Sequence, residues 1–145
     1  QACHDVAVGQ SEQAARQEGY PQFRITEPNE PGGLAAAGPR EEYFPIFYRV
    51  DFQTNAAPPG FDLASDSIRR QTLVQARDTG RTTASGRLSL APGGGDGRHG
   101  FLVAVPVYRR GAPVETVAQR RAELRGFCVG VFRVDQIVTE ALKSL

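Results

Sequence analysis

Residues 60–80 read GFDLASDSIRRQTLVQARDTG and predict a helix that is bounded at both ends. Ser65 or Asp66 suits the N-cap, because a short polar side chain accepts a hydrogen bond from a free amide of the first turn. Gly80 supplies the C-terminal stop, since glycine adopts the left-handed conformation without strain. One face of the helix consists of residues that recur at helical spacing: Ile68, Thr72, Leu73 and Ala76.

Extended segments surround this helix in the sequence. Tyr43–Phe52 is dense in aromatic and β-branched residues and predicts a strand before the helix. Three further strands are predicted after it, at Thr82–Leu90, Phe101–Tyr108 and Gly126–Val134. Because Phe101–Tyr108 is continuously apolar, we expect both faces of that strand to be covered.

The N-terminal part of the chain predicts less regular structure. Residues 1–19 predict a helix that ends at Gly19. Phe23–Thr26 alternates briefly and predicts a short strand. Glu27–Arg40 contains three prolines and three glycines and is predicted to be a loop, as is the turn-rich segment Gln53–Gly60.

The C-terminal part predicts two short helices. Pro113–Leu124 is predicted to be a loop that leads into a helix capped by Thr116, and Asp135 is suited to cap a last helix at Gln136–Leu145. Pro92–Gly100 is glycine-rich and predicts a turn between two strands. A hairpin turn is favoured there over a phosphate-binding loop, because no lysine follows and the loop lies between two strands.

The order of these elements predicts an α+β fold. Strands that follow one another through short connections favour an antiparallel sheet, here with helices mostly on one side. The length of 145 residues suits a single domain that spans residues 1–145.

The bulk composition excludes two classes of protein. The chain has 17 basic and 16 acidic residues, and this balance argues against a nucleic-acid partner. The longest apolar run, Phe101–Tyr108, is far shorter than the roughly 20 residues that cross a bilayer. The chain begins with glutamine and contains no methionine, which leads us to expect a processed or excised fragment.

No pattern in the sequence predicts catalysis, a metal or a cofactor. His4 and His99 are the only histidines, and with Cys3 they lack the spacing of a zinc site. No nucleophile elbow is present. Cys3 and Cys128 leave two alternatives open: they form one disulfide, or Cys128 is a small apolar residue inside a strand, which is the more common case.

Asp62 is the acid with the most unusual setting, since it stands between apolar neighbours ahead of a helix. One interpretation, favoured from the residues alone, is a turn or capping aspartate. The other is a buried acceptor for the N–H groups of a ligand, because a half-buried carboxylate needs such donors to offset its desolvation.

Six stretches resemble, in the same order, segments of the CHASE domain. This domain is the extracytoplasmic sensor of plant cytokinin-receptor histidine kinases and of many bacterial histidine kinases and diguanylate cyclases. Because the matches follow the family order over most of the chain, the resemblance is specific. The matching segments are Glu18–Ile25, Tyr43–Ile46, Gly60–Ser65, Ala76–Gly80, Val105–Tyr108 and Arg125–Asp135.

The resemblance implies a PAS-like antiparallel sheet with flanking helices. In the family, a long helix precedes two PAS-like modules, and this chain resembles the membrane-distal module alone. The parent would be an inner-membrane histidine kinase or diguanylate cyclase, with this module on its periplasmic or extracellular side. We expect a homodimer in the full-length receptor, and contact with the membrane only through segments outside this chain.

The resemblance also implies a ligand site. In cytokinin-binding members an aspartate at the position of Asp62 bonds the adenine, and a main-chain contact maps near Ala84. The implied site residues are Asp62, Thr83, Ala84, Ser85, Val105, Phe127, Gly130 and Val131. Because Val105 replaces a phenylalanine of the plant members, we expect a wider or wetter pocket for a small molecule such as an adenine derivative. The alternative function is a protein-interaction or dimerisation module whose pocket is filled by side chains.

Overall fold

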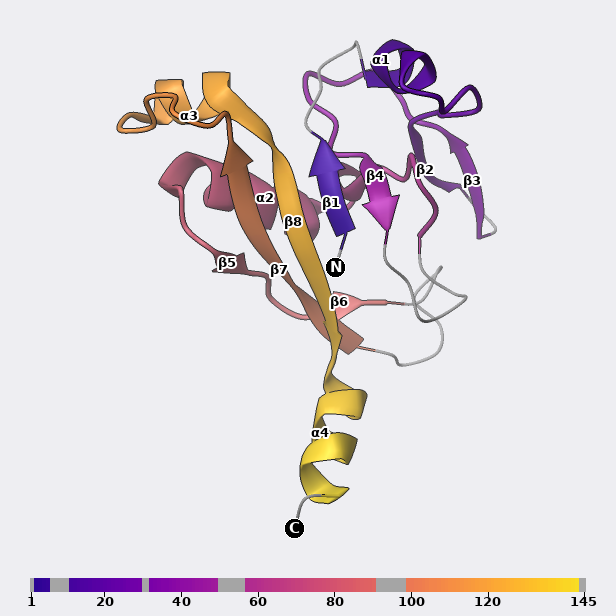
Figure 1. The fold of residues 1–145 in the computed structure, drawn as a ribbon. Helices are drawn as coiled ribbons and strands as arrows, with labels where there is room; N and C mark the ends of the chain where they lie inside the picture. Colours follow the sequence, from indigo (N-terminus) through magenta and orange to yellow (C-terminus); the bar gives the residue numbers. More distant parts are fainter. Residues whose placement is uncertain (1, 6–10, 30–31, 50–56, 91–98, 144–145) are drawn as a thin grey trace.

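The computed structural model describes residues 2–5, 11–29, 32–49, 57–90 and 99–143. An antiparallel sheet of six strands, in the order β4-β1-β8-β7-β5 with β6 also paired to β7, forms its centre (Figure 1). The strands of this sheet are β1 (Ala2–Asp5), β4 (Ile46–Arg49), β5 (Thr83–Ala84), β6 (Leu88–Ser89), β7 (His99–Tyr108) and β8 (Leu124–Arg133). The α+β prediction is therefore confirmed, and the arrangement is compatible with a PAS-like fold.

The remaining elements surround this sheet. A separate two-stranded sheet joins β2 (Thr26–Asn29) to β3 (Gly33–Ala36). The helices are α1 (Ser11–Gln17), the 3-10 turn η1 (Leu63–Ser65), α2 (Ser67–Thr79), α3 (Val117–Glu123) and α4 (Val134–Lys143). In Figure 1, α2 lies across one face of β7 and β8, and α4 extends away from the body.

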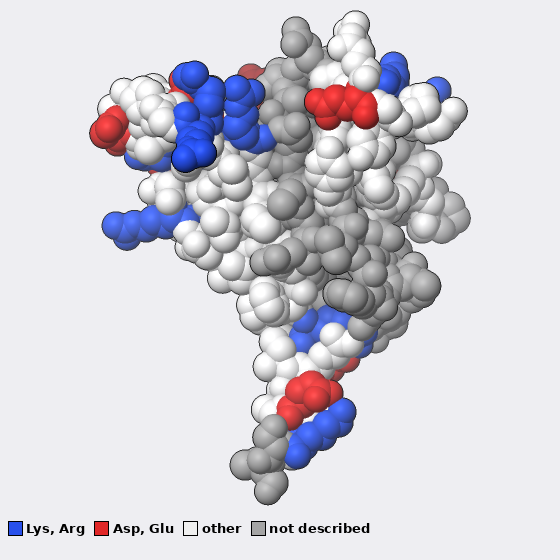
Figure 2. Space-filling model, viewed as in Figure 1, with Lys and Arg blue, Asp and Glu red and all other residues white. Residues whose placement is uncertain are grey.

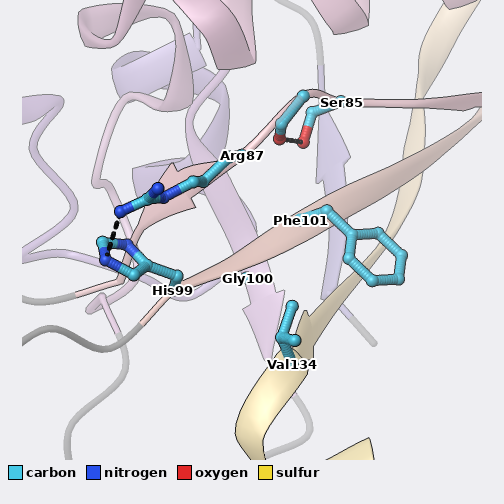
Figure 3. Close-up of a pocket in the computed structure, with 7 residues that line it drawn as sticks. Ser85, Arg87, His99, Gly100, Phe101 and Val134 are labelled. Carbon is cyan, nitrogen blue, oxygen red and sulfur yellow. Dashed lines mark hydrogen bonds between the residues drawn. The ribbon is translucent and has the colours of Figure 1, made fainter.

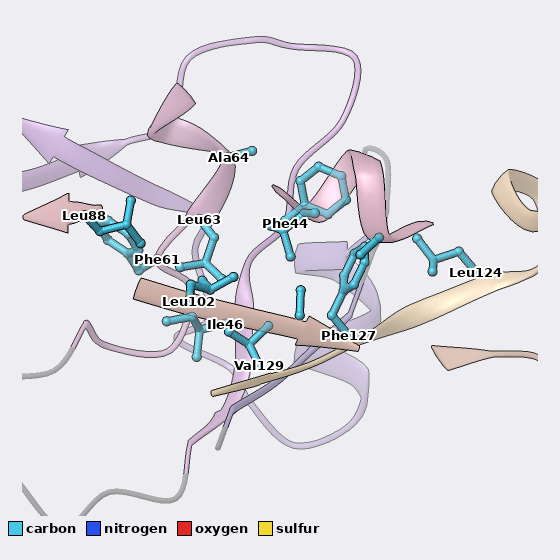
Figure 4. Close-up of a cluster of buried hydrophobic side chains, with 13 residues drawn as sticks. Phe44, Ile46, Phe61, Leu63, Ala64, Leu88, Leu102, Leu124, Phe127 and Val129 are labelled. Carbon is cyan, nitrogen blue, oxygen red and sulfur yellow. The ribbon is translucent and has the colours of Figure 1, made fainter. Parts of the chain in front are cut away.

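The main core lies between α2 and the sheet. The register pairs Ala104 of β7 with Val129 of β8, so these side chains share the face that α2 covers. Leu73 and Ala76 of α2 are buried against this face. Figure 4 shows the apolar side chains gathered there, which include Phe44, Phe61, Leu63, Leu102 and Phe127.

Helix α2 follows its predicted boundaries. The Asp66 side chain caps its start by accepting a hydrogen bond from the Arg69 amide at 2.9 Å. Gly80 ends it in the left-handed conformation, with φ 70°. Of the predicted face, Thr72, Leu73 and Ala76 are buried, whereas Ile68 at the edge of that face is exposed.

Two N-terminal predictions are wrong. Residues 1–19 do not form one helix, because β1 occupies Ala2–Asp5 and α1 begins only at Ser11. Glu27–Arg40 is not only a loop, since it contains most of the β2–β3 hairpin. β1 pairs with the distant strands β4 and β8, which local composition does not reveal, whereas β2 and β3 pair with each other as a local hairpin. Phe23, placed in a predicted strand, instead joins a small apolar cluster with Ala15, Ile25 and Phe47.

The predictions for the second half need smaller corrections. Thr82–Leu90 contains two strands of two residues, and between them the Ser85 hydroxyl accepts a hydrogen bond from the Leu102 amide at 2.8 Å. Thr116 caps α3 as predicted. The last helix starts at Val134, so Asp135 lies in its first turn, and the predicted turns over residues 53–56 and 92–98 lie outside the described residues.

The outer face of β7 and β8 is apolar and open. Val105 and Val107 are 41% and 46% exposed, so the expectation that both faces of this strand are covered is wrong. Phe101 and Phe132 stack on the same face, with ring centroids 5.2 Å apart. Figure 2 shows this face largely without charge, between basic side chains near α3 and the charged residues of α4.

A polar clamp fixes the end of α2 to α3. The Asp78 carboxylate accepts hydrogen bonds from Arg121 and from Arg77, and the Asp78 carbonyl oxygen accepts one from Arg120 at 2.7 Å. Tyr108 of β7 donates to the carbonyl oxygen of the buried Arg77 at 2.5 Å. The hydrogen bonds from Arg121, and then those from Arg77, hold the pKa of the Asp78 carboxyl at about 2 against the opposing effect of burial.

We expect the clamp to make stability depend on pH in acid. Because the folded-state pKa of Asp78 is depressed, its contribution is full above about pH 4 and is lost as the pH falls toward about 2. Solvent screening at the exposed Arg121 limits the contribution to about 1 kcal/mol. Urea unfolding of the wild type and of Asp78→Asn at several pH values measures it. Equal pH slopes for the two proteins in this window would contradict the assignment.

Candidate functional site

Asp62 is the most deeply buried acid among the described residues, with a side chain that is 0% exposed. Its Oδ1 accepts hydrogen bonds from the amides of Phe44 and Ala64, at 2.8 and 2.9 Å. Its Oδ2 accepts one from the Arg40 guanidinium at 2.8 Å. Arg40 also pairs with Glu27, whose carboxylate thus extends the network to the β2–β3 sheet. The carboxylate therefore has protein donors on both oxygens.

The backbone around Asp62 joins two parts of the fold. The Asp62 amide donates to the carbonyl of Thr26 at 2.7 Å, and the Leu63 amide donates to that of Phe44 at 3.1 Å. Isolated bridges pair Thr26 with Phe61 and Pro45 with Asp62. The segment that carries Asp62 consequently lies between the start of β2 and the chain that enters β4.

Gly60 permits this close packing. It has φ +89°, and a Cβ at this position would overlap the carbonyl oxygen of Arg24. The Gly60 carbonyl accepts a hydrogen bond from the Thr26 amide at 2.9 Å, which holds the segments around Gly60 and Thr26 close together. Glycine is needed here for space as well as for backbone conformation.

The sequence-implied site residues do not all meet in one place. Phe127 is 1% exposed on the core face of the sheet. Its ring centroid lies 5.6 Å from that of Phe44, the residue whose amide donates to Asp62. Val131 pairs with Leu102 on the same sheet face but is 57% exposed. Thr83 pairs with Ala104, which also belongs to this face.

The other implied residues lie elsewhere. Val105 is opposite Cys128 and is exposed on the outer face of the sheet. Ala84 and Gly130 both pair with Val103 of β7. Val103 and Val105 are two residues apart on this strand and therefore lie on the same, outer face of the sheet. Ser85 lies just after β5, where its amide donates to the Leu102 carbonyl at 2.7 Å. The implied residues are thus divided between the two faces and one edge of the sheet.

Ser85 lines a pocket of about 500 Å³ at the base of the sheet. Three segments build it: the connection from β5 to β6, the start of β7 and the first residue of α4. Figure 3 shows Arg87 and His99 on one side of the hollow, and Phe101 and Val134 on the other. The lining residues are Ser85, Gly86, Arg87, His99, Gly100, Phe101 and Val134.

The polar side of this pocket is built from two nitrogen-rich groups. Arg87 contacts His99 Nε2 at 2.6 Å, and because a guanidinium only donates, Nε2 is the acceptor. The neutral ring then carries its proton on Nδ1, which is buried and has no hydrogen-bond partner among the described residues. Among the residues that the structure describes, no carboxylate forms an ion pair with Arg87. The pocket combines the Arg87 cation with apolar surface, whereas the unpartnered Nδ1 of His99 has no exposed surface.

Sequence reasoning missed most of this pocket. Arg87 and His99 are 12 residues apart and meet because β6 pairs with β7, with Ser89 opposite His99. No spacing pattern in the sequence indicates that pairing. Val134 was predicted as the end of a strand, whereas it begins α4 and closes the pocket.

A second hollow of about 640 Å³ lies at the start of α2. Arg40 and Arg70 line it together with Ser65, Ser67 and Gln71. Arg40 already pairs with Asp62 and Glu27, so much of its charge is compensated. Two residues that line this hollow, Arg40 and Ala64, donate hydrogen bonds to the Asp62 carboxylate.

Two further kinds of feature bear on function, namely metal-binding clusters and membrane-spanning helices. Across the described residues, no group of three or more histidine, cysteine, aspartate or glutamate side chains is placed to hold a metal ion. None of the described helices has the length and apolar character required to cross a bilayer.

Comparison with known proteins identifies the family. A family model described as the CHASE domain matches residues 5–145. A curated relative, "Hybrid signal transduction histidine kinase A" from Dictyostelium discoideum, is 27% identical over 128 residues. The aligned region covers 83% of this chain but only 6% of the relative, so the chain corresponds to a small part of that protein.

We expect Gly60→Ala to destabilise the fold by about 2–4 kcal/mol, because it combines positive φ with overlap against the Arg24 backbone. Gly19→Ala is the matched control, since Gly19 has φ +99° but open space around it. Its cost should be only about 1–2 kcal/mol. Urea unfolding compares the two variants, and equal losses would show that close packing at Gly60 is unimportant.

Asp62→Ala should lower the free energy of unfolding by about 3–5 kcal/mol, because it leaves the Arg40 charge and two buried amides without an acceptor. Asp62→Asn keeps an oxygen for the two amides, so its loss should be smaller. Chemical denaturation of both variants measures the difference. A loss below about 1 kcal/mol for Asp62→Ala would mean that the hydrogen bonds to Asp62 contribute little to the stability of the fold.

Proposed function

This chain belongs to the CHASE domain family, the sensor domains of signalling receptors such as histidine kinases, and we propose that it binds a small molecule and relays that binding through α4. CHASE domains are extracytoplasmic parts of membrane receptors and are not catalytic. The observation that carries the proposal is the pocket at Ser85, because its wall includes Val134, the first residue of α4. A molecule bound there touches the sheet and the start of the last helix together.

The lining indicates the chemistry of the ligand. Arg87 favours a hydrogen-bond acceptor, such as a carboxylate or a ring nitrogen. Phe101 and Val134 favour an apolar part on the opposite side. A small organic acid with a hydrophobic group fits both requirements. An adenine derivative of the cytokinin class remains the ligand that the family resemblance suggests, and its ring nitrogens also accept hydrogen bonds.

Binding at Asp62 is the second possible location. It agrees with the family position of the adenine-binding aspartate and with the hollow formed by Arg40, Ser65 and Arg70. A ligand that donates to Asp62 would have to replace Arg40 at Oδ2, since both oxygens already have protein donors. Of the implied wall residues, Phe127 contacts Phe44, whose amide donates to Asp62.

The proposed relay uses the direct junction of β8 with α4. β8 ends at Arg133 and α4 begins at Val134, so the two elements join without a loop. A bound molecule that moves Val134 therefore moves the base of the helix. In the parent receptor, which we propose to be a homodimeric histidine kinase or diguanylate cyclase, α4 would lead toward the output domain.

A protein-interaction or dimerisation module is the alternative, and one observation favours it. Val105 and Val107 are exposed on the outer sheet face, and α4 exposes a further apolar stripe. Contiguous apolar surface on a soluble domain marks contact with another protein more often than an unused surface. The exposed apolar residues of α4 are Val134, Ile137, Val138 and Leu142.

A thermal-shift screen with adenine derivatives, amino acids and small organic acids tests the proposal. A ligand at 100 times its dissociation constant should stabilise the wild type by about 2.7 kcal/mol. Arg87→Gln should abolish this shift, because it removes the cation that faces the pocket. Arg81→Gln makes the same charge change outside the pocket and should retain the shift.

The outcomes separate the two locations and the alternative. A shift that survives in Arg87→Gln but is lost in Asp62→Asn would place the ligand at Asp62. No shift with any compound class, together with a concentration-dependent dimer in sedimentation, would support the interaction module instead. The two variants are compared with their own ligand-free melting temperatures, so lower intrinsic stability is not mistaken for lost binding.

A further inference from the structure

Arg40 contacts the buried Asp62 carboxylate and also lines the hollow at the start of α2. Its guanidinium donates to Asp62 Oδ2 at 2.8 Å. The Asp62 side chain is 0% exposed, whereas that of Arg40 is 25% exposed. We propose that Arg40 makes an autoinhibitory contact, in which its guanidinium occupies the position that the N–H groups of a ligand need at Asp62. This inference rests on the second proposed ligand location, the one at Asp62.

The two oxygens of Asp62 differ in how easily a partner can be exchanged. Oδ1 accepts hydrogen bonds from the backbone amides of Phe44 and Ala64, which cannot leave without moving the chain. Oδ2 accepts one from Arg40, which lies in the irregular segment between β3 and β4. The long Arg40 side chain can change rotamer while the backbone stays in place. Oδ2 is therefore the acceptor that an incoming donor would take.

Arg40 has a second partner that would hold it after displacement. Its Nη1 donates to Asp62, whereas its Nη2 pairs with the carboxylate of Glu27 in β2. The guanidinium also lies over the Tyr43 ring, 5.7 Å from the ring centroid. These two contacts do not involve Asp62. The contact with Asp62 can therefore open without leaving the Arg40 charge unpaired.

The guanidinium at Oδ2 indicates which chemistry this position accepts. A guanidinium is a planar group of N–H donors without an acceptor. A buried carboxylate that loses such a partner needs another donor, because an unpaired buried charge is strongly unfavourable. The ligand class is thus a planar nitrogen compound that presents N–H groups, such as an amidine. A carboxylic acid, which suits the pocket at Arg87, would be repelled by the Asp62 charge.

The contact would lower the apparent affinity of the domain for such a ligand. The apparent dissociation constant is the intrinsic value divided by the fraction of molecules in which Oδ2 is free. A free fraction of about 1% weakens binding about 100-fold. Removal of Arg40 would therefore tighten binding, whereas removal of a residue that contacts the ligand favourably would weaken it.

Calorimetric titration of the 145-residue chain with benzamidine tests the proposal. Arg40→Met keeps an apolar side chain but removes the donors, and it should bind benzamidine at least about tenfold more tightly than the wild type. The double variant Arg40→Met/Asp62→Asn lacks the carboxylate charge and should lose this gain. Arg109→Met is the matched control, since it also removes an arginine ion pair, here with Glu123, and should bind as the wild type does.

Arg40→Met also removes the ion-pair partner of a buried carboxylate, so its thermal melting is followed in parallel. If the variant is unfolded alone, benzamidine should restore a cooperative melting transition. Equal binding to the wild type and Arg40→Met, no binding to the folded variant, no recovery of an unfolded one, or a gain that persists without Asp62 would each overturn the proposal. All these variants retain Arg87, so such a failure would not count against the proposed pocket at Ser85, which Arg87→Gln tests separately.

Discussion

The buried carboxylate of Asp62 is the interaction on which the arrangement of the domain depends. A charge without solvent exposure requires donors, and here they come from two segments: Arg40 and Phe44 ahead of β4, and Ala64 beside Asp62 itself. The requirement brings together the β2–β3 sheet, the entry to β4 and the start of α2. The surrounding motif serves the same purpose, since Gly60 makes the space and Phe61 and Leu63 fill the core.

Local signals in the sequence were sufficient for some elements and insufficient for others. Helix α2 was predicted at both ends because Asp66 and Gly80 act within one turn of the residues they cap. β1 was missed because its partners, β4 and β8, lie more than 40 residues away. The unusual setting of Asp62 was recognised, but its donors Arg40 and Phe44 are supplied by the tertiary fold. The pocket at Arg87 and His99 depends on strand pairing in the same way.

The two candidate ligand locations differ in what the protein already satisfies. At Asp62 the polar groups have partners within the protein, which is the condition of a structural site. At Arg87, a guanidinium faces a hollow with apolar walls, which is the condition of a site that still lacks an anionic or acceptor group. The family position favours the first location and the physical chemistry of the described residues favours the second.

The junction of β8 with α4 sets the size of the movement that the domain can produce. α4 has ten residues, so it is about 15 Å long at 1.5 Å per residue. With no loop to absorb a change in direction, a 10° change in the twist of the β7–β8 ribbon would swing the far end of α4 by about 2.6 Å, given that length. In the proposed relay, the helix would act as a rigid arm that converts small angular changes in the sheet into displacements about as large as a hydrogen-bond length.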